Sequence, residues 1–205
     1  MVGARTKLVV IVIVGLALMG IALAVVTRPT ASLSTDAGYS GSLMPEEVPV
    51  VDFALTDENG KPVSLKTVTG APAILTFLYT SCKDICPLTA QQIRGALDQS
   101  GSDVPVIAVS VDAKGDTSDA VRRWLASQQM TGRIRWALGT ENQLAKVWKS
   151  YGVAGQSTHM DHSAYVFVLD RDGKRCVSWP VSQLTPEGLA HDLKLLLSRN
   201  GKCRT

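Results

Sequence analysis

The sequence has little cysteine and, in its first part, no negative charge. Its 205 residues include four cysteines, too few for a small fold held together by disulfides. No aspartate or glutamate precedes Asp36. Hydrophobic residues make up 45% of the chain and charged residues 19%, so the composition excludes a largely disordered protein. The length fits one medium-sized domain with an added tail or anchor.

The greater part of the chain also lacks an excess of charge of either sign. The formal net charge of +3 comes from 21 basic and 18 acidic residues. Three of the basic residues, Arg5, Lys7 and Arg28, lie near the N-terminus, so 18 residues of each sign remain beyond residue 28. A domain without net charge offers no cationic surface for phosphates, which argues against nucleic-acid binding.

A long apolar run occupies residues 8–26, which contain Leu, Val, Ile, Ala, Gly and Met alone. A helix over this run would be roughly 28 Å long at ~1.5 Å per residue, about the thickness of the apolar core of a bilayer. Arg5 and Lys7 precede the run and favour a cytoplasmic N-terminus. Residues 1–28 are therefore predicted to anchor the chain in a bacterial inner (cytoplasmic) membrane by a single pass, with the folded domain in the periplasm.

Cleavage by signal peptidase is the alternative for this segment. Ala22-Leu23-Ala24 has the small-x-small pattern of a cleavage site. The apolar run is long for a cleavable signal, and this length favours the uncleaved anchor. In both cases the folded part lies outside the cytoplasm, where thiols are normally oxidised.

Beyond the anchor, composition and periodicity divide the chain into a linker and one domain. Residues 29–47 are rich in Ser, Thr and Gly and predict a flexible linker. Residues 48–205 show regular strand and helix patterns. Strands are expected at residues 50–55, 61–65, 71–79, 104–111, 133–138, 164–169 and 174–179. Helices are expected at residues 87–99, 120–125, 144–151 and 189–197.

This alternation of strands and helices predicts an α/β fold with a mixed sheet. The order, with an extra N-terminal β-hairpin and an inserted strand and helix, is that of a thioredoxin-like fold.

Two cysteines lie where such a fold carries chemistry. Cys82 and Cys86 fall between a buried strand and a helix that Pro87 opens. If the segment is helical, the spacing of four residues places both sulfur atoms on one face, about 5–6 Å apart at Cβ. This arrangement permits a shared metal ion, and it also permits a structural disulfide.

A third ligand would decide between these two possibilities. His162 precedes an expected strand whose start should lie beside the cysteine loop. Two thiolates and an imidazole form a soft set of three ligands, which suits copper. Zinc prefers four ligands, and His159 or Met160 would have to supply the fourth.

The other two cysteines, Cys176 and Cys203, occur near the C-terminus. Cys176 begins an expected strand, and the last helix should return antiparallel to the start of that strand. A structural disulfide between them would hold the C-terminal tail. Two unpaired thiols on a frayed tail are the alternative.

Several segments together resemble the Sco/SenC family of copper chaperones. The segments that carry the resemblance are Thr80-Ser81-Cys82-Lys83-Asp84-Ile85-Cys86-Pro87, Asp52-Phe53, Asn59-Gly60-Lys61-Pro62-Val63, Val109-Ser110-Val111-Asp112, Asp116-Thr117, Tyr151-Gly152-Val153 and Asp161-His162-Ser163-Ala164. The resemblance covers about residues 48–198. It implies a thioredoxin-like domain behind one membrane anchor, with copper bound by Cys82, Cys86 and His162. It also implies delivery of copper to the copper-bearing subunit of cytochrome c oxidase.

The sequence departs from the family pattern at two positions. Lys83 and Ala113 stand where many members have proline. Neither change removes a ligand, although Lys83 places a cation beside the cysteines. Asp84 is a candidate for hydrogen bonds to the ligating groups.

Two functions fit these residues. The first is a metallochaperone, a binding and delivery protein rather than an enzyme, with copper chaperones or thiol reductases as further partners. The second is a thiol–disulfide oxidoreductase that uses Cys82 and Cys86 to reduce a partner protein. The spacing CxxxC, where general reductases have CxxC, and the presence of His162 favour the first.

Overall fold

The structure, a computed structural model, describes residues 3, 38–45, 48, 51–153 and 165–204. The segment expected to anchor the chain, residues 1–28, lies outside the described residues apart from Gly3. Within the described part, no helix combines the length and apolar character needed to cross a membrane.

Apart from a short strand at Ser42–Leu43, the strands and α-helices follow the order that the sequence predicts. The strands are β1 Ser42–Leu43, β2 Leu55–Thr56, β3 Pro62–Val63, β4 Ala73–Leu78, β5 Val106–Ser110, β6 Ile134–Ala137, β7 Tyr165–Leu169 and β8 Arg175–Pro180. The α-helices are α2 Ile85–Ser100, α3 Ser118–Ser127, α4 Glu141–Tyr151 and α5 Pro186–Ser198, and 3-10 turns cover Leu65–Thr67 and Val181–Gln183. Every element expected after residue 70 is confirmed, with ends that shift by a few residues.

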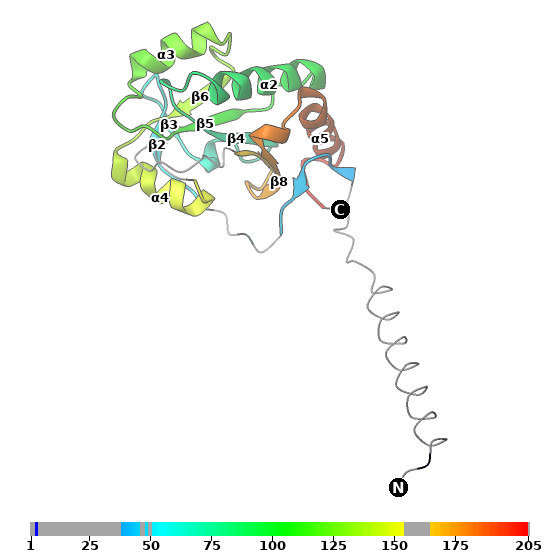
Figure 1. Cartoon of the computed structure of the whole chain (residues 1–205). Coiled ribbons are helices and arrows are strands. Elements are labelled where there is room, and N and C mark those ends of the chain that lie inside the picture. Colours follow the sequence, from blue (N-terminus) through cyan, green and yellow to red (C-terminus); the bar gives the residue numbers. More distant parts are fainter. Residues whose placement is uncertain (1–2, 4–37, 46–47, 49–50, 154–164, 205) are drawn as a thin grey trace. The chain divides into compact units, whose positions relative to one another are not determined.

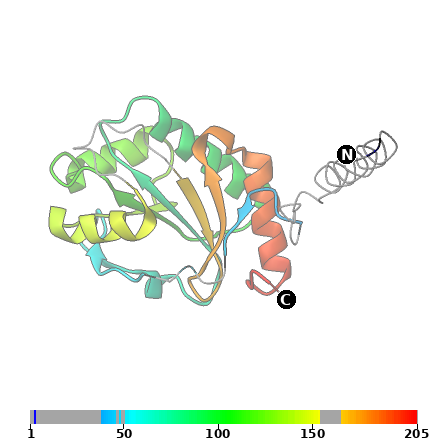
Figure 2. The same cartoon turned by 60° about the horizontal axis from the view of Figure 1, so that its bottom comes forward.

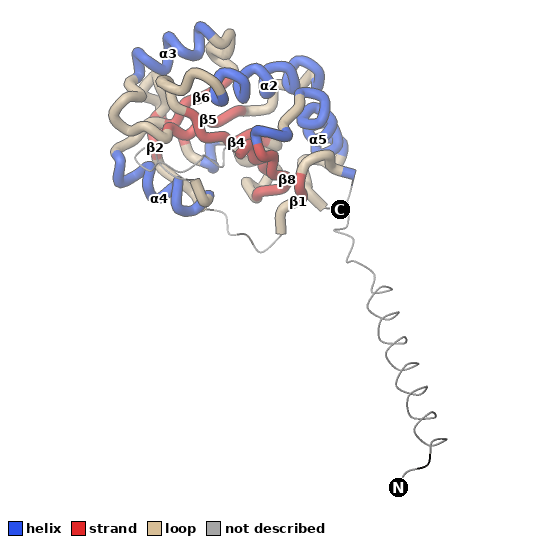
Figure 3. Tube along the Cα trace, in the orientation of Figure 1, coloured by secondary structure: helices blue, strands red, loops and turns tan. Residues whose placement is uncertain are grey.

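Six strands form one mixed sheet in the order β1-β8-β7-β4-β5-β6. The pairs β4–β5 and β5–β6 are parallel, whereas β7 pairs antiparallel with both β4 and β8. Leu75 of β4 lies opposite Ile107 of β5 on one side and Phe167 of β7 on the other. The strand that leads into the cysteine loop is therefore an inner strand of the sheet (Figure 3).

Both faces of the sheet are covered, which explains why β4 is a continuous apolar run. Its six residues are all buried. Ile74 belongs to a core shared with α2, α3 and α5, whereas Leu75 belongs to a second core shared with the β2–β3 hairpin and α4. Side chains alternate between the faces of a strand, so each face needs its own apolar residues. Figure 1 shows α2 and α3 on the side of the sheet opposite α4.

Threonine side chains fix where three of the helices begin. Thr117, Thr140 and Thr185 each accept a hydrogen bond from a backbone N–H in the first turn of α3, α4 and α5. These bonds satisfy donors that a helix N-terminus otherwise leaves unpaired.

The expected first hairpin is present, but its strands are shorter than predicted. The sequence pattern placed a strand at residues 50–55, whereas β2 covers Leu55–Thr56 and pairs with Pro62–Val63. Pro62 has no N–H to extend the pairing. Thr56 instead exchanges two backbone hydrogen bonds with Leu138, at 3.1 and 2.7 Å. The sheet hydrogen bonds of Thr56 thus go to the end of β6.

The expected linker also ends earlier than predicted. Residues 38–45 belong to the folded domain, because β1 pairs antiparallel with β8. The backbone N–H groups of Ser40 and Gly41 donate to the buried carboxylate of Asp192 at 2.6 and 3.0 Å. Figure 2 shows this segment beside α5. The composition rich in Ser and Gly suggested a flexible chain, but the acceptor that orders it lies more than 150 residues away in sequence.

Candidate metal centre

The two candidate cysteines lie on either side of the boundary between a loop and α2. The backbone N–H of Cys82 donates to the carbonyl of Tyr79 at 3.2 Å, which closes a turn directly after β4. The helix begins at Ile85, so Cys86 lies in its first turn and Cys82 precedes it. The premise that one helix carries both cysteines is therefore wrong. The turn, rather than a helical face, brings them together.

The sulfur of Cys82 contacts the first turn of α2. The backbone N–H of Cys86 donates to the Sγ of Cys82 at 3.2 Å. Asp84 occupies the N-cap position, but its side chain makes no cap hydrogen bond. The Cys82 sulfur thus accepts an N–H of the kind that a capping side chain normally accepts. A helix N-terminus and an N–H donor both stabilise negative charge on sulfur.

Both sulfur atoms are free thiols and both are buried. Cys82 is 7% exposed and Cys86 is 3% exposed. The pair is not joined in the structure, which does not support the alternative of a structural disulfide. Two adjacent unpaired thiols suit a soft metal ion.

Burial determines the protonation state of the Cys86 thiol. Burial, followed by the side chain of Cys82, raises the pKa of the Cys86 thiol. Burial and the neighbouring Cys82 also raise the pKa of Tyr79 to about 12. The Cys86 thiol therefore keeps its proton at neutral pH until a metal ion or an attacking group displaces it.

Two charged residues stand between the cysteines on the surface. Lys83 and Asp84 are both exposed. Among the described residues, no hydrogen bond joins the Asp84 side chain to either cysteine. The role of Asp84 toward a bound metal remains a prediction.

The third expected ligand, His162, lies outside the described residues, as do His159 and Met160. The strand that follows them does lie beside the site, because β7 begins at Tyr165 and pairs antiparallel with β4. Among the residues that the structure describes, no three His, Cys, Asp or Glu side chains gather closely enough to hold a metal ion. The ligand set of three thus remains a prediction.

A carboxylate that sequence reasoning did not place at the site lies beside the cysteine turn. Asp116 is 6% exposed. Its Oδ1 accepts from the backbone N and the Oγ1 of Thr80, at 2.7 and 2.8 Å, and its Oδ2 accepts from the Oγ of Ser110 at 2.6 Å. Burial raises the pKa of Asp116, while the hydrogen bonds from Ser110 and Thr80 oppose the rise. In the sequence, the one indication that Asp116 matters was the Asp116-Thr117 pair, which is among the segments that resemble the Sco/SenC family.

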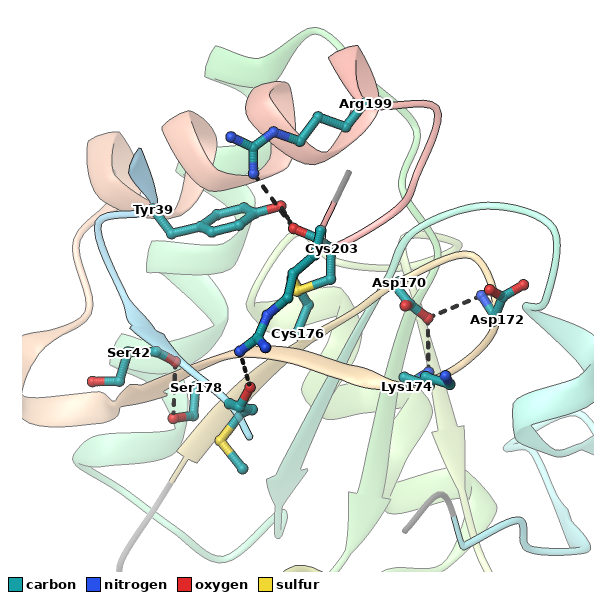
Figure 4. The surroundings of a disulfide bond; sticks show 11 residues. Tyr39, Ser42, Asp170, Asp172, Lys174, Cys176, Ser178, Arg199 and Cys203 are labelled. Carbon is teal, nitrogen blue, oxygen red and sulfur yellow. Dashed lines mark hydrogen bonds between the residues drawn. A yellow bond between two sulfur atoms is a disulfide. The ribbon is translucent and has the colours of Figure 1, made fainter. Parts of the chain in front are cut away.

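The remaining two cysteines form a disulfide away from the free pair. Cys176 in β8 bonds to Cys203 of the C-terminal tail, with 5.4 Å between their Cα atoms. The carbonyl of Cys203 accepts from the hydroxyl of Tyr39 and from Arg199, at 3.2 and 3.4 Å (Figure 4). Of the two predicted alternatives for these cysteines, the structure contains the disulfide.

The mixed sheet with a buried inner strand is typical of a thioredoxin-like domain. Its two free thiols lie where such a domain can hold a soft metal ion or exchange disulfides. The SCO1/SenC family model matches residues 44–198. The chain therefore belongs to the SCO1/SenC family.

Individual relatives agree with this assignment. The chain resembles the structure of Bradyrhizobium japonicum ScoI with copper bound, with 34% identity, a TM-score of 0.60, and coverage of 70% of this chain and 96% of that one. It also resembles the structure of BsSco, in which a disulfide switch was identified. BsSco is described as a member of the Sco family of cytochrome c oxidase assembly proteins. The values there are 20% identity, a TM-score of 0.60, and coverage of 73% and 97%. The second likeness supports the fold alone.

A SCO2-like protein of Rickettsia conorii is 27% identical over 135 residues, which are 60% of this chain. The match spans 65% of the length of that relative. Together with the solved structures, these matches confirm the thioredoxin-like α/β fold that the sequence predicted.

Proposed function

We propose that this protein is a membrane-anchored, extracytoplasmic copper chaperone. It binds copper through Cys82, Cys86 and His162 and delivers the ion to the copper centre of cytochrome c oxidase. The observation that carries the proposal is the pair of buried free thiols, joined by the N–H···S contact of 3.2 Å at the start of α2.

The chemistry of the site suits a soft ion that must leave again. Two sulfur ligands favour Cu(I), and an imidazole accepts either oxidation state of copper. A site with few ligands stays open to an incoming ligand of the acceptor. Since Cys86 holds its proton in the free protein, copper binding must release that proton, and the affinity will rise with pH.

The family relationship supports the cargo and the acceptor. ScoI of Bradyrhizobium japonicum has been solved with copper bound. BsSco is described as a member of a family of cytochrome c oxidase assembly proteins, and this chain belongs to the same family. The location in a bacterial inner membrane rests on the apolar run of residues 8–26.

The second candidate function is a thiol–disulfide oxidoreductase. The geometry of the pair favours it, since the Cys82 sulfur accepts the backbone N–H of Cys86 at the N-terminus of α2. Here the Cys82 thiolate attacks a disulfide of the partner and releases one partner thiolate. Cys86 then loses its proton and attacks Cys82 in the mixed disulfide. The products are a Cys82–Cys86 disulfide and two reduced partner cysteines.

An anaerobic Cu(I) titration of the reduced full chain against a competing chelator tests the first function. We expect one copper ion per chain, and we expect His162→Ala to weaken its binding by at least about tenfold, or ~1.4 kcal/mol. His191→Ala is the matched control, because His191 is exposed on α5 and contacts the Gly38 carbonyl. It should leave the copper affinity unchanged.

The double variant Cys82→Ser/Cys86→Ser should abolish competitive binding altogether. An unchanged affinity in His162→Ala would disprove the set of three ligands. A wild-type chain that binds no copper, yet cycles readily between dithiol and disulfide, would favour the oxidoreductase instead.

A further inference from the structure

The buried carboxylate of Asp116 has a defined place beside the cysteine turn. Thr80, the residue after Tyr79, donates to Asp116 through both its backbone N–H and its hydroxyl. The next hydrogen bond along the chain closes the turn from Tyr79 to Cys82. The Cys82 sulfur then accepts the N–H of Cys86. Asp116 thus holds the peptide that begins the turn, the turn carries Cys82, and the Cys82 sulfur contacts the backbone of Cys86.

Asp116 is itself held by the end of the neighbouring strand. Its backbone N–H donates to the carbonyl of Asp112 at 3.0 Å, and its Oδ2 accepts from Ser110, the last residue of β5. The ends of β4 and β5 are fixed to one another, since Val111 donates to the carbonyl of Leu78 at 3.0 Å. The carboxylate thus connects the turn that carries Cys82 to the rigid end of the sheet.

A buried carboxylate is costly unless each oxygen has partners, and three short hydrogen bonds provide them here. A second carboxylate, Asp192, shows the same solution elsewhere. It accepts from Ser40, Gly41 and the indole N–H of Trp179. None of these three donors belongs to the cysteine turn. The two carboxylates are chemically alike, and only Asp116 bonds to the segment that holds a thiol.

We propose that Asp116 is a positioning residue for the Cys82–Cys86 pair. It fixes the turn so that the thiols stay in a reduced arrangement ready for a metal, and it opposes the rearrangement into a disulfide. The consequence for copper affinity rests on the proposed function, whereas the consequence for disulfide formation does not.

The test compares Asp116→Ala, Asp116→Asn and the control Asp192→Ala in the full chain. The first measurement is the equilibrium of the metal-free protein with glutathione buffers, with alkylation and mass spectrometry to follow each cysteine. Release of the turn in Asp116→Ala should shift this equilibrium toward the Cys82–Cys86 disulfide by at least about tenfold, or about 30 mV. The second measurement is the anaerobic Cu(I) titration, where the affinity should fall by at least about tenfold.

The conservative variant separates geometry from charge. Asparagine keeps an acceptor for Thr80, and its amide can donate to the Ser110 hydroxyl. Asp116→Asn should therefore stay within about threefold of the wild type in both measurements. Asp192→Ala should lose stability and leave both measurements unchanged. Thr80→Val removes the hydroxyl donor and should shift the exchange equilibrium about threefold toward the disulfide, as Asp116→Ala does more strongly. It replaces Asp116→Ala as the test if Asp116→Ala does not fold.

Three results would overturn the proposal. The first is an exchange equilibrium in Asp116→Ala that equals that of the wild type; Thr80→Val takes its place if Asp116→Ala does not fold. The second is an effect of Asp116→Asn as large as that of Asp116→Ala. The third is a shift of the same size in Asp192→Ala. Absence of copper binding in the wild type would refute the proposed function alone, because the glutathione measurement needs no metal.

Discussion

Replacement of Cys176 and Cys203 by serine should lower the free energy of unfolding by about 3.5 kcal/mol. The two residues are 27 positions apart, so the disulfide closes a loop of that length. The loss of chain entropy in the unfolded state grows with the logarithm of loop length and gives this value at room temperature. Serine is close to cysteine in size, so packing changes little, whereas its hydroxyl at the fully buried position 176 adds to the loss of stability.

Urea unfolding measures the difference, provided that the other cysteines cannot oxidise. Both the disulfide-bonded and the serine proteins therefore carry Cys82→Ser and Cys86→Ser, which leaves one pair able to form a bond. With a urea dependence of about 2 kcal/mol per M, the midpoint should fall by between about 1.5 and 2 M. No reductant is needed in either sample.

A local control separates the bond from its surroundings. Tyr39→Phe removes the hydrogen bond from the Tyr39 hydroxyl to the Cys203 carbonyl and should cost about 1 kcal/mol. A double serine variant that loses less than Tyr39→Phe would refute the reasoning. In that case, either the unfolded chain would already be compact or the tail would not be held in the native state.

Two further predictions concern the turn of the first hairpin and the strand β1. Asp57→Asn should lower stability by about 2 kcal/mol at neutral pH, because its carboxylate accepts from Arg135 at 3.0 and 3.1 Å. Despite burial, hydrogen bonds from Lys61 and Arg135 hold the pKa of Asp57 below its ordinary value of 3.8. The contribution of the Asp57 carboxylate to the free energy of unfolding is therefore complete above pH 3.8 and is lost as the pH falls through the pKa of the folded state. The unfolding curves of the variant and the wild type should converge in acid. Gly41→Ala should cost about 2 kcal/mol, because the new methyl would lie 2.5 Å from atoms of Trp179 and Val177, and hydrogen exchange of the β1 amides should rise. Equal exchange in both proteins would contradict the close packing of β1.

The order of elements could be predicted because it depends on local periodicity. β4 is buried on both faces and therefore reads as an unbroken apolar run, and α5 shows its apolar stripe directly. The pairing of Cys176 and Cys203 followed from the antiparallel return of the last helix, although unpaired thiols fitted the same sequence.

The parts that could not be predicted depend on contacts between distant residues. β1 is ordered by Asp192, and Thr56 of β2 exchanges hydrogen bonds with Leu138, just after β6. Neither contact can be recognised from the local sequence of the segment that it orders. Asp116 was missed for the same reason, since its donor Thr80 lies 36 residues earlier.

The two cysteine pairs must hold different oxidation states in one compartment if the proposed function is right. Copper loading needs Cys82 and Cys86 as thiols, whereas Cys176 and Cys203 form a disulfide. A disulfide that raises the free energy of unfolding is, by thermodynamic linkage, harder to reduce in the folded protein than in the unfolded chain by the same free energy. A contribution of about 3.5 kcal/mol lowers the reduction potential of this pair by about 75 mV relative to the unfolded chain.

The Cys82–Cys86 pair gains no comparable protection, because its loop spans only four residues and the loop-closure effect is smaller. The Asp116 network, as we propose it, adds a bias toward the dithiol. The fold thus lowers the reduction potential of the Cys176–Cys203 pair by more than that of the Cys82–Cys86 pair. A reductant of intermediate potential can prepare the copper site and leave the C-terminal disulfide intact.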